Sequence, residues 1–79
     1  MTPVTIYTTP SCGFCHLAKE FFQAHSVSYT EKDVARDATA REEMLNKSNQ
    51  MGVPVIEIGD AIIVGFYREK IAELLGIQE

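Results

Sequence analysis

The sequence contains two cysteines, three positions apart in the segment Cys12-Gly13-Phe14-Cys15. Three residues is less than one turn of an α-helix, so the two sulfur atoms are expected to be neighbours on a helix that begins near Cys12. Thiols at this spacing can close a disulfide without a large movement of the backbone. The pair therefore predicts redox chemistry, with a Cys12–Cys15 disulfide as its oxidised form.

The two cysteines are expected to have different roles. Cys12 lies at the predicted start of the helix, where unpaired N–H groups and the helix dipole favour a thiolate. It falls on the polar side of the helix with His16, whereas Cys15 falls beside Phe22 at the edge of the apolar side. We therefore predict that Cys12 is the catalytic nucleophile and that Cys15 is the shielded catalytic thiol that resolves a mixed disulfide. This chemistry needs no metal and no bound cofactor.

Three other interpretations of the cysteines remain open. The two residues can be ordinary small buried side chains, ligands of a soft metal such as copper, or the switch of a redox sensor that binds a partner in one oxidation state. Copper chaperones also place a C-x-x-C after their first strand, but their elements follow the order β-α-β-β-α-β. His16 points about 100° away from Cys15 on a helix, and no second cysteine pair is present to complete a zinc site. We therefore predict no metal site.

The composition is that of one small globular domain spanning residues 1–79. Hydrophobic residues make up 46% of the 79 residues, and the formal net charge is −4. An acidic chain is unsuited to non-specific nucleic-acid binding, and no apolar run approaches the roughly 18 residues of a membrane span. The segment Met1-Thr2-Pro3 has no basic stretch and no long apolar run follows it, so we predict no secretory signal. The expectation is a cytoplasmic monomer.

Short alternating segments are expected to position the cysteines. Runs of β-branched and aromatic residues predict strands, and apolar residues at helical spacing predict helices, with Phe14, Leu17 and Phe21 on the apolar face of the first one. The second helix can begin at Asp37 or at Thr39, because either residue is a suitable N-cap. The predicted elements are a strand at 4–8, a helix from 12 to about 25, a strand at 27–34, a helix at 36–47, strands at 53–58 and 61–64 joined by a Gly59-Asp60 turn, and a helix at 67–75 followed by Gly76.

The resulting order, β-α-β-α-β-β-α, predicts an α/β fold. A strand-helix-strand crossover makes the first two strands parallel, and the later hairpin adds two antiparallel strands. We expect one four-stranded mixed sheet flanked by three helices.

Three motifs make the sequence resemble the glutaredoxin-like branch of the thioredoxin superfamily: the segment from Tyr7 to Cys15, Gly52-Val53-Pro54, and Gly65-Phe66. The resemblance implies a minimal thioredoxin fold in which Pro54 is preceded by a cis peptide bond and faces the cysteines. It also implies that the backbone of Val53 pairs with an incoming peptide or with glutathione. The substrate-binding residues expected on this basis are Gly13, Phe14, Val53, Pro54, Gly65, Phe66 and Tyr67.

Two departures from the family pattern bear on the electron donor. Glutaredoxins that use glutathione usually carry a lysine near position 8 and an acidic residue soon after the glycine that matches Gly65, whereas this chain has Thr8 and Phe66-Tyr67. The Gly65-Phe66 ending is similar to NrdH-type redoxins, which are reduced by thioredoxin reductase and serve ribonucleotide reductase. We therefore expect electrons from thioredoxin reductase and NADPH in preference to glutathione. Disulfide-containing proteins, ribonucleotide reductase among them, are the expected substrates.

Overall fold

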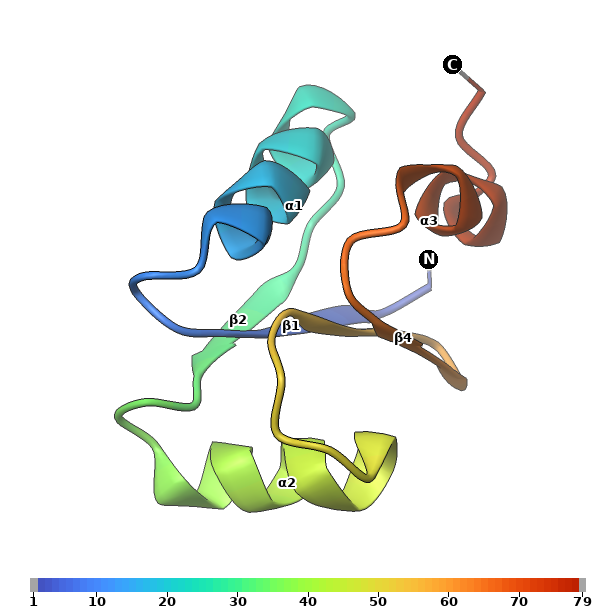
Figure 1. Ribbon diagram of the computed structural model, residues 1–79. Coiled ribbons are helices and arrows are strands. Elements are labelled where there is room, and N and C mark those ends of the chain that lie inside the picture. Colours follow the sequence, from blue (N-terminus) through green and yellow to red (C-terminus); the bar gives the residue numbers. More distant parts are fainter. Residues whose placement is uncertain (1, 79) are drawn as a thin grey trace.

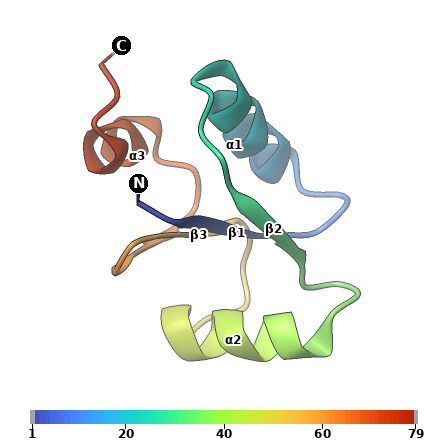
Figure 2. The same cartoon turned by 180° about the vertical axis from the view of Figure 1, so that it is seen from behind.

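A single four-stranded sheet with helices on both faces organises the chain, and the computed structural model describes residues 2–78 of it. Helices α1 and α3 cover one face of the sheet and α2 covers the other (Figures 1 and 2). None of the helices in this range combines the length and apolar character that crossing a membrane requires. The elements are β1 (Val4–Thr8), α1 (Gly13–Ala24), β2 (Thr30–Asp33), α2 (Ala38–Ser48), β3 (Val55–Ile58), β4 (Ala61–Val64) and α3 (Arg68–Leu75).

The strand order β2-β1-β3-β4 confirms the predicted mixed sheet of the thioredoxin fold. Strand β1 pairs in parallel with β2 and antiparallel with β3, and β3 pairs antiparallel with β4. Because β1 and β3 lie in the centre, their alternate side chains enter two separate cores. The carboxyl end of β1 leads directly into the turn that carries the cysteines, so the centre of the sheet fixes the position of the site.

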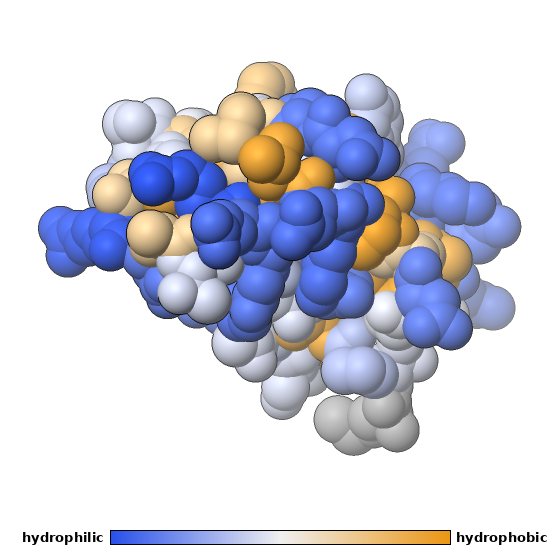
Figure 3. All heavy atoms as spheres, turned by 90° about the horizontal axis from the view of Figure 1, so that it is seen from below, coloured by the Kyte–Doolittle hydropathy of each residue, from blue (hydrophilic) through white to orange (hydrophobic). Residues whose placement is uncertain are grey.

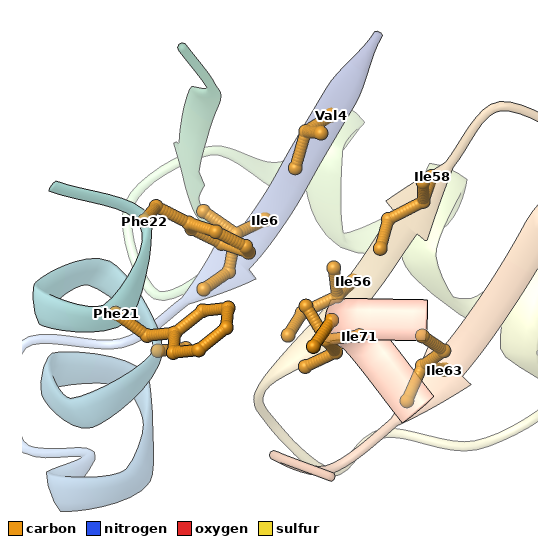
Figure 4. Packing of buried hydrophobic residues seen from close by; sticks show 10 residues of the cluster. Val4, Ile6, Phe21, Phe22, Ile56, Ile58, Ile63 and Ile71 are labelled. Carbon is orange, nitrogen blue, oxygen red and sulfur yellow. The ribbon is translucent and has the colours of Figure 1, made fainter. Parts of the chain in front are cut away.

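The larger core fills the space between the sheet and the helices α1 and α3. Figure 4 shows isoleucines from the central strands facing Phe21 and Phe22 of α1 and Ile71 of α3. Burial of these aliphatic and aromatic groups is the main source of stability in a domain of this size. The buried members of the cluster are Val4, Ile6, Ala18, Phe21, Phe22, Ile56, Ile58, Ile63, Ile71 and Ala72.

The smaller core, on the α2 face, is supplemented by polar contacts. Helix α2 buries only Ala40 and Met44, and its outer surface is predominantly hydrophilic (Figure 3). The hydroxyl of buried Tyr7 donates to Glu43 and accepts from Lys47. Ion pairs then link Lys32 to Glu43 at 2.6 Å and Lys47 to Glu57 at 2.8 Å. Helix α2 is thus held by a network around Tyr7 as much as by apolar packing.

The predicted apolar face of α1 is wrong at two positions. Phe14 and Leu17 are exposed, with 65% and 47% of their surface accessible. The buried side of the helix is formed by Cys15, Ala18, Phe21 and Phe22, and at 100° per residue Leu17 falls outside this arc. Phe14 falls within the arc but lies in the first turn of the helix, at the end that carries the cysteines.

The predicted start of the second strand is also wrong, because β2 begins at Thr30 and not at Val27. Ser26 adopts a positive φ of 56°, and the Val27 N–H donates to the Phe22 carbonyl at 2.8 Å. These features belong to the end of α1. The residues just after Val27 then form the link into the sheet.

The two later helices start slightly after their predicted limits. Helix α3 begins at Arg68, and Gly76 ends it with a φ of 71°, as its predicted place after the helix requires. Helix α2 begins at Ala38, and its N-cap is Asp37, whose carboxylate accepts a hydrogen bond from the Ala40 N–H at 3.1 Å. The structure thus selects Asp37 over Thr39.

Replacing Asp37 by alanine is expected to lower the free energy of unfolding by about 1 kcal/mol, because the first turn of α2 loses its side-chain acceptor. Urea denaturation of the reduced protein measures the change. Thr39→Ala is the matched control, since Thr39 is exposed. An equal loss in both variants would contradict the assignment of the cap.

Candidate active site

Cys12 is the N-cap of α1, which sets the position of its sulfur. Its backbone is extended, with φ −86° and ψ 110°, and its Sγ accepts a hydrogen bond from the Cys15 N–H at 3.1 Å. The Cys12 N–H donates to the Thr9 carbonyl at 3.3 Å, which closes the turn before the helix. Sulfur here takes the place that an oxygen of Ser, Thr or Asp normally occupies at a helix start. An N–H donor and the helix dipole therefore both favour negative charge on Cys12.

Cys15 has the opposite environment. Only 1% of its surface is exposed, whereas Cys12 is half-buried, and both are free thiols in the structure. Burial, together with a hydrogen bond with Cys12 and the charge of Cys12, raises the pKa of the Cys15 thiol to about 12. Cys15 therefore keeps its proton at neutral pH. When Cys12 enters a mixed disulfide, its charge is lost. The charge repulsion that raised the pKa of Cys15 is then removed, so Cys15 ionises more easily.

A second segment, from the end of the α2–β3 loop, forms a pocket together with Phe14, which lies between the cysteines in the chain. The Val53–Pro54 peptide bond is cis, as predicted, and Pro54 is buried. The Pro54 carbonyl accepts a hydrogen bond from the Gly65 N–H at 2.8 Å. This bond joins the beginning of β3 to the end of β4. Among the described residues, the main-chain N–H and carbonyl of Val53 have no hydrogen-bond partner, so they are available to an incoming chain.

Gly65 is required by the geometry of this pocket. Its φ is 103°, a region that residues with a side chain rarely adopt, and a Cβ atom there would lie 3.1 Å from the Tyr67 ring. The glycine thus lets the chain turn sharply out of β4 while Tyr67 stays close to it.

Six of the seven predicted substrate-binding residues line one open pocket of about 240 Å³, which we call the proline pocket. The seventh, Gly13, lines a neighbouring hollow with Phe14 and Leu17. Phe14 borders both and lies between the two cysteines in the chain, so the pocket borders the segment that carries them. The residues of the proline pocket are Phe14, Val53, Pro54, Gly65, Phe66 and Tyr67.

One charged feature of the site was missed in the sequence. Thr8 is buried and donates to Glu31 Oε2 at 2.8 Å, and Lys19 Nζ donates to the same oxygen at 2.9 Å. Lys19 is the largest cause that lowers the pKa of the Glu31 carboxyl, and Glu31 in turn raises the pKa of Lys19. A cation, Lys19, therefore lies close to Thr8, but it is paired with Glu31. In the sequence, the only indication that Lys19 lies near the cysteines is its position one helical turn after Cys15.

No cluster of three or more His, Cys, Asp or Glu side chains in residues 2–78 is arranged to hold a metal ion. His16 contacts the Pro10 carbonyl through Nε2 at 3.4 Å, which places its ring against the turn before the helix.

The raised pKa of Cys15 predicts a loss of stability at high pH. The unfolded chain releases this proton near pH 9, whereas the folded protein holds it up to about pH 12, so stability is complete below this range and falls within it. Urea midpoints of the reduced protein and of Cys15→Ser, at about pH 8 and about pH 10.5, measure the effect. The wild type should lose more stability, by at most about 1.4 kcal/mol per pH unit. Equal losses would show that burial of Cys15 has no such effect.

Comparisons with known proteins agree with this site. The glutaredoxin family profile matches residues 4–63. An uncharacterized glutaredoxin-like 8.6 kDa protein in the rubredoxin operon of Clostridium pasteurianum is 42% identical over 72 residues, which cover 91% of this chain and 96% of that protein.

Two solved structures are similar over nearly the whole chain. A mutant of the thioredoxin-like protein BC3987 has a TM-score of 0.92 at 35% identity, covering 99% of this chain and 100% of that one. The glutaredoxin-like protein NrdH-redoxin from Escherichia coli, described as having a thioredoxin-like activity profile, has a TM-score of 0.80 at 29% identity, covering 91% and 93%. With its paired thiols Cys12 and Cys15, this chain belongs to the glutaredoxin family of thiol–disulfide oxidoreductases.

Proposed function

We propose that the protein is a dithiol electron carrier that reduces disulfide bonds in other proteins. The observation that carries the proposal is the asymmetry of the two thiols. Cys12 is half-buried and caps a helix, and Cys15 is buried beside it with a raised pKa. One sulfur is thus prepared to attack, and the other is protected until the attack has occurred.

The reaction takes two thiol–disulfide exchanges. The Cys12 thiolate attacks one sulfur of the substrate disulfide, which forms a mixed disulfide and releases the other substrate sulfur as a thiolate. Cys15 then loses its proton and attacks the Cys12 sulfur, so the Cys12–Cys15 disulfide forms and the second substrate thiolate leaves. Two electrons have passed from the dithiol to the substrate, and two protons end on the substrate thiols.

Thioredoxin reductase, supplied by NADPH, is the electron donor that we propose in preference to glutathione. Glutathione carries two carboxylates and an amino group, so a selective site needs charged or N–H partners for them. The proline pocket instead presents apolar and aromatic groups, with Tyr67 63% exposed. The nearby cation Lys19 is paired with Glu31. Each missing charge-assisted contact is worth about 1.5 to 3 kcal/mol.

A protein partner suits the same surface better. Its polypeptide can pair with the backbone of Val53 and cover the aromatic side chains of the pocket. The similarity to NrdH-redoxin, whose activity profile is described as thioredoxin-like, supports this donor. It also makes ribonucleotide reductase a candidate substrate.

The two cysteine variants should fail in different ways. Cys12→Ser removes the nucleophile and should abolish disulfide reduction, whereas Cys15→Ser should still attack and accumulate a mixed disulfide with the substrate protein. Non-reducing electrophoresis and mass spectrometry after mixing with an oxidised protein substrate detect that species. The reverse pattern would show that the roles of the two thiols are exchanged.

The donor is tested by following reduction of the oxidised protein. NADPH with thioredoxin reductase should recharge it faster than glutathione does. Tyr67→Asp should raise the glutathione-dependent rate by about tenfold, because it supplies a carboxylate for the glutathione amino group. Tyr67→Asn is the matched control, which removes the ring without adding charge. We choose Tyr67 because Thr8 is buried and bonded to Glu31, so a lysine there would disturb the fold.

If glutathione already recharges the wild type as fast as thioredoxin reductase does, the proposed donor is wrong. The cysteine mechanism would stand in that case, because it depends on Cys12 and Cys15 and not on the source of electrons.

A further inference from the structure

An exposed apolar surface lies near the cysteines, and part of it has no role in the thiol–disulfide exchange described above. Phe14, Leu17 and Tyr67 have 65%, 47% and 63% of their surfaces exposed, and Phe66 is half-buried between α1 and α3. Large apolar side chains grouped in this way on a small domain commonly mark an interaction site. Leu17 is the member that the proline pocket does not include.

Leu17 lines a separate pocket of about 230 Å³ on the same face of the sheet as the cysteines, which we call the α1–α3 pocket. Helices α1 and α3 lie side by side on that face, and the segment from β4 passes between them (Figure 1). Phe66 lines both the α1–α3 pocket and the proline pocket, so the two are neighbours that share this side chain as a wall. The residues of the α1–α3 pocket are Leu17, Glu20, Phe21, Ala24, His25, Phe66 and Arg68.

Aromatic groups form the base of the α1–α3 pocket. Phe21 is buried, meets Phe66 edge to face with ring centroids 6.0 Å apart, and meets the His25 ring at 4.6 Å. The Arg68 guanidinium lies over the Phe21 ring at 5.5 Å. The base is thus apolar and held in place by packing, while the rim carries one acidic residue, Glu20, and one basic residue, Arg68. Such a pocket fits a bulky apolar side chain whose own backbone stays near solvent.

We propose that the α1–α3 pocket is a second substrate subsite, which receives an aliphatic or aromatic side chain from the polypeptide that carries the target disulfide. The inference rests on the proposed function and identifies the kind of protein disulfide that this site selects. A polypeptide that pairs with Val53 lies over the proline pocket, and its continuation meets Phe66 and then Leu17. The preferred substrates therefore have a large apolar residue a few positions from the attacked cysteine.

The position of the α1–α3 pocket, across Phe66 from the proline pocket, favours a polypeptide as the occupant. Glutathione is a tripeptide with charged ends and no large apolar side chain, so it has no group to fill the α1–α3 pocket. A longer chain spans about 3.3 Å per extended residue, so a few residues suffice to pass from one pocket to the next.

A series of paired synthetic peptides with an internal disulfide tests the proposal. The two peptides of a pair differ at one position, which is leucine in one and serine in the other, and the pairs place this position two to four residues from the reactive cysteine on either side. The wild type should reduce the best leucine peptide with a kcat/KM about tenfold above that of its serine counterpart, the factor expected when a leucine side chain leaves water. Turnover of bis(2-hydroxyethyl) disulfide serves as the reference for each variant.

Leu17→Gln should remove the preference for leucine, since it places a polar amide in the pocket. Leu17→Met should retain the preference, because the side chain stays apolar. Leu45→Gln is the matched control: Leu45 is also a helical leucine, with 41% of its surface exposed, but it lies on α2 across the sheet. It should behave as the wild type does.

The possible failures are distinguishable. If the wild type reduces both peptides equally at every position, or if Leu17→Gln keeps the preference, the subsite is wrong and the proposed function stands. If the wild type reduces none of the peptides, the proposed function fails and the subsite fails with it.

Discussion

The hydrogen bond from the Cys15 N–H to Cys12 Sγ is the interaction on which the site depends. It makes the nucleophilic sulfur part of the first turn of α1, so the position of that sulfur is as well defined as the helix itself. It also brings the two sulfurs together, because the donor belongs to the residue whose thiol must attack next. The helix is anchored in turn by Ala18, Phe21 and Phe22 against the sheet, so the core of the domain determines where the chemistry occurs.

The two faces of the sheet differ in how their helices are held and in which side chains they expose. On the α2 face, the buried Tyr7 ring and its hydroxyl lie among Lys32, Glu43 and Lys47, which leaves a hydrophilic exterior (Figure 3). Exposed ion pairs of this kind add little stability individually, but together they orient a helix with few apolar residues. The α1–α3 face has the reverse character, with apolar side chains left open around the cysteines. The exposed aromatic side chains Phe14 and Tyr67 lie near the cysteines, whereas α2 exposes Leu45 among polar residues.

The charges close to the cysteines are arranged to cancel. Lys19 and Glu31 form a pair at 2.9 Å beside the end of β1, where a lone lysine would attract an anionic ligand. Thr8 adds a hydrogen bond to the same carboxylate oxygen and closes the group from the sheet side. On the proposed function, we therefore expect the site to distinguish ligands by shape and apolar area more than by charge. The proposed protein substrates, the proposed donor and the proposed subsite at Leu17 all depend on this same property, because each is recognised through apolar contact.

The sequence by itself determined the redox pair, the order of the elements, the mixed sheet and the members of the proline pocket. The redox pair and the elements depend on residues within a few positions of one another, whereas the cis bond before Pro54 and the residues of the proline pocket were implied by the family motifs. Tertiary structure alone decided the remaining features. Asp37 rather than Thr39 caps α2, and Leu17 stays exposed because the sheet covers only the centre of the helical stripe. Lys19 meets Glu31 because β2 packs beside β1 under α1, a contact between residues 12 positions apart that no local pattern encodes.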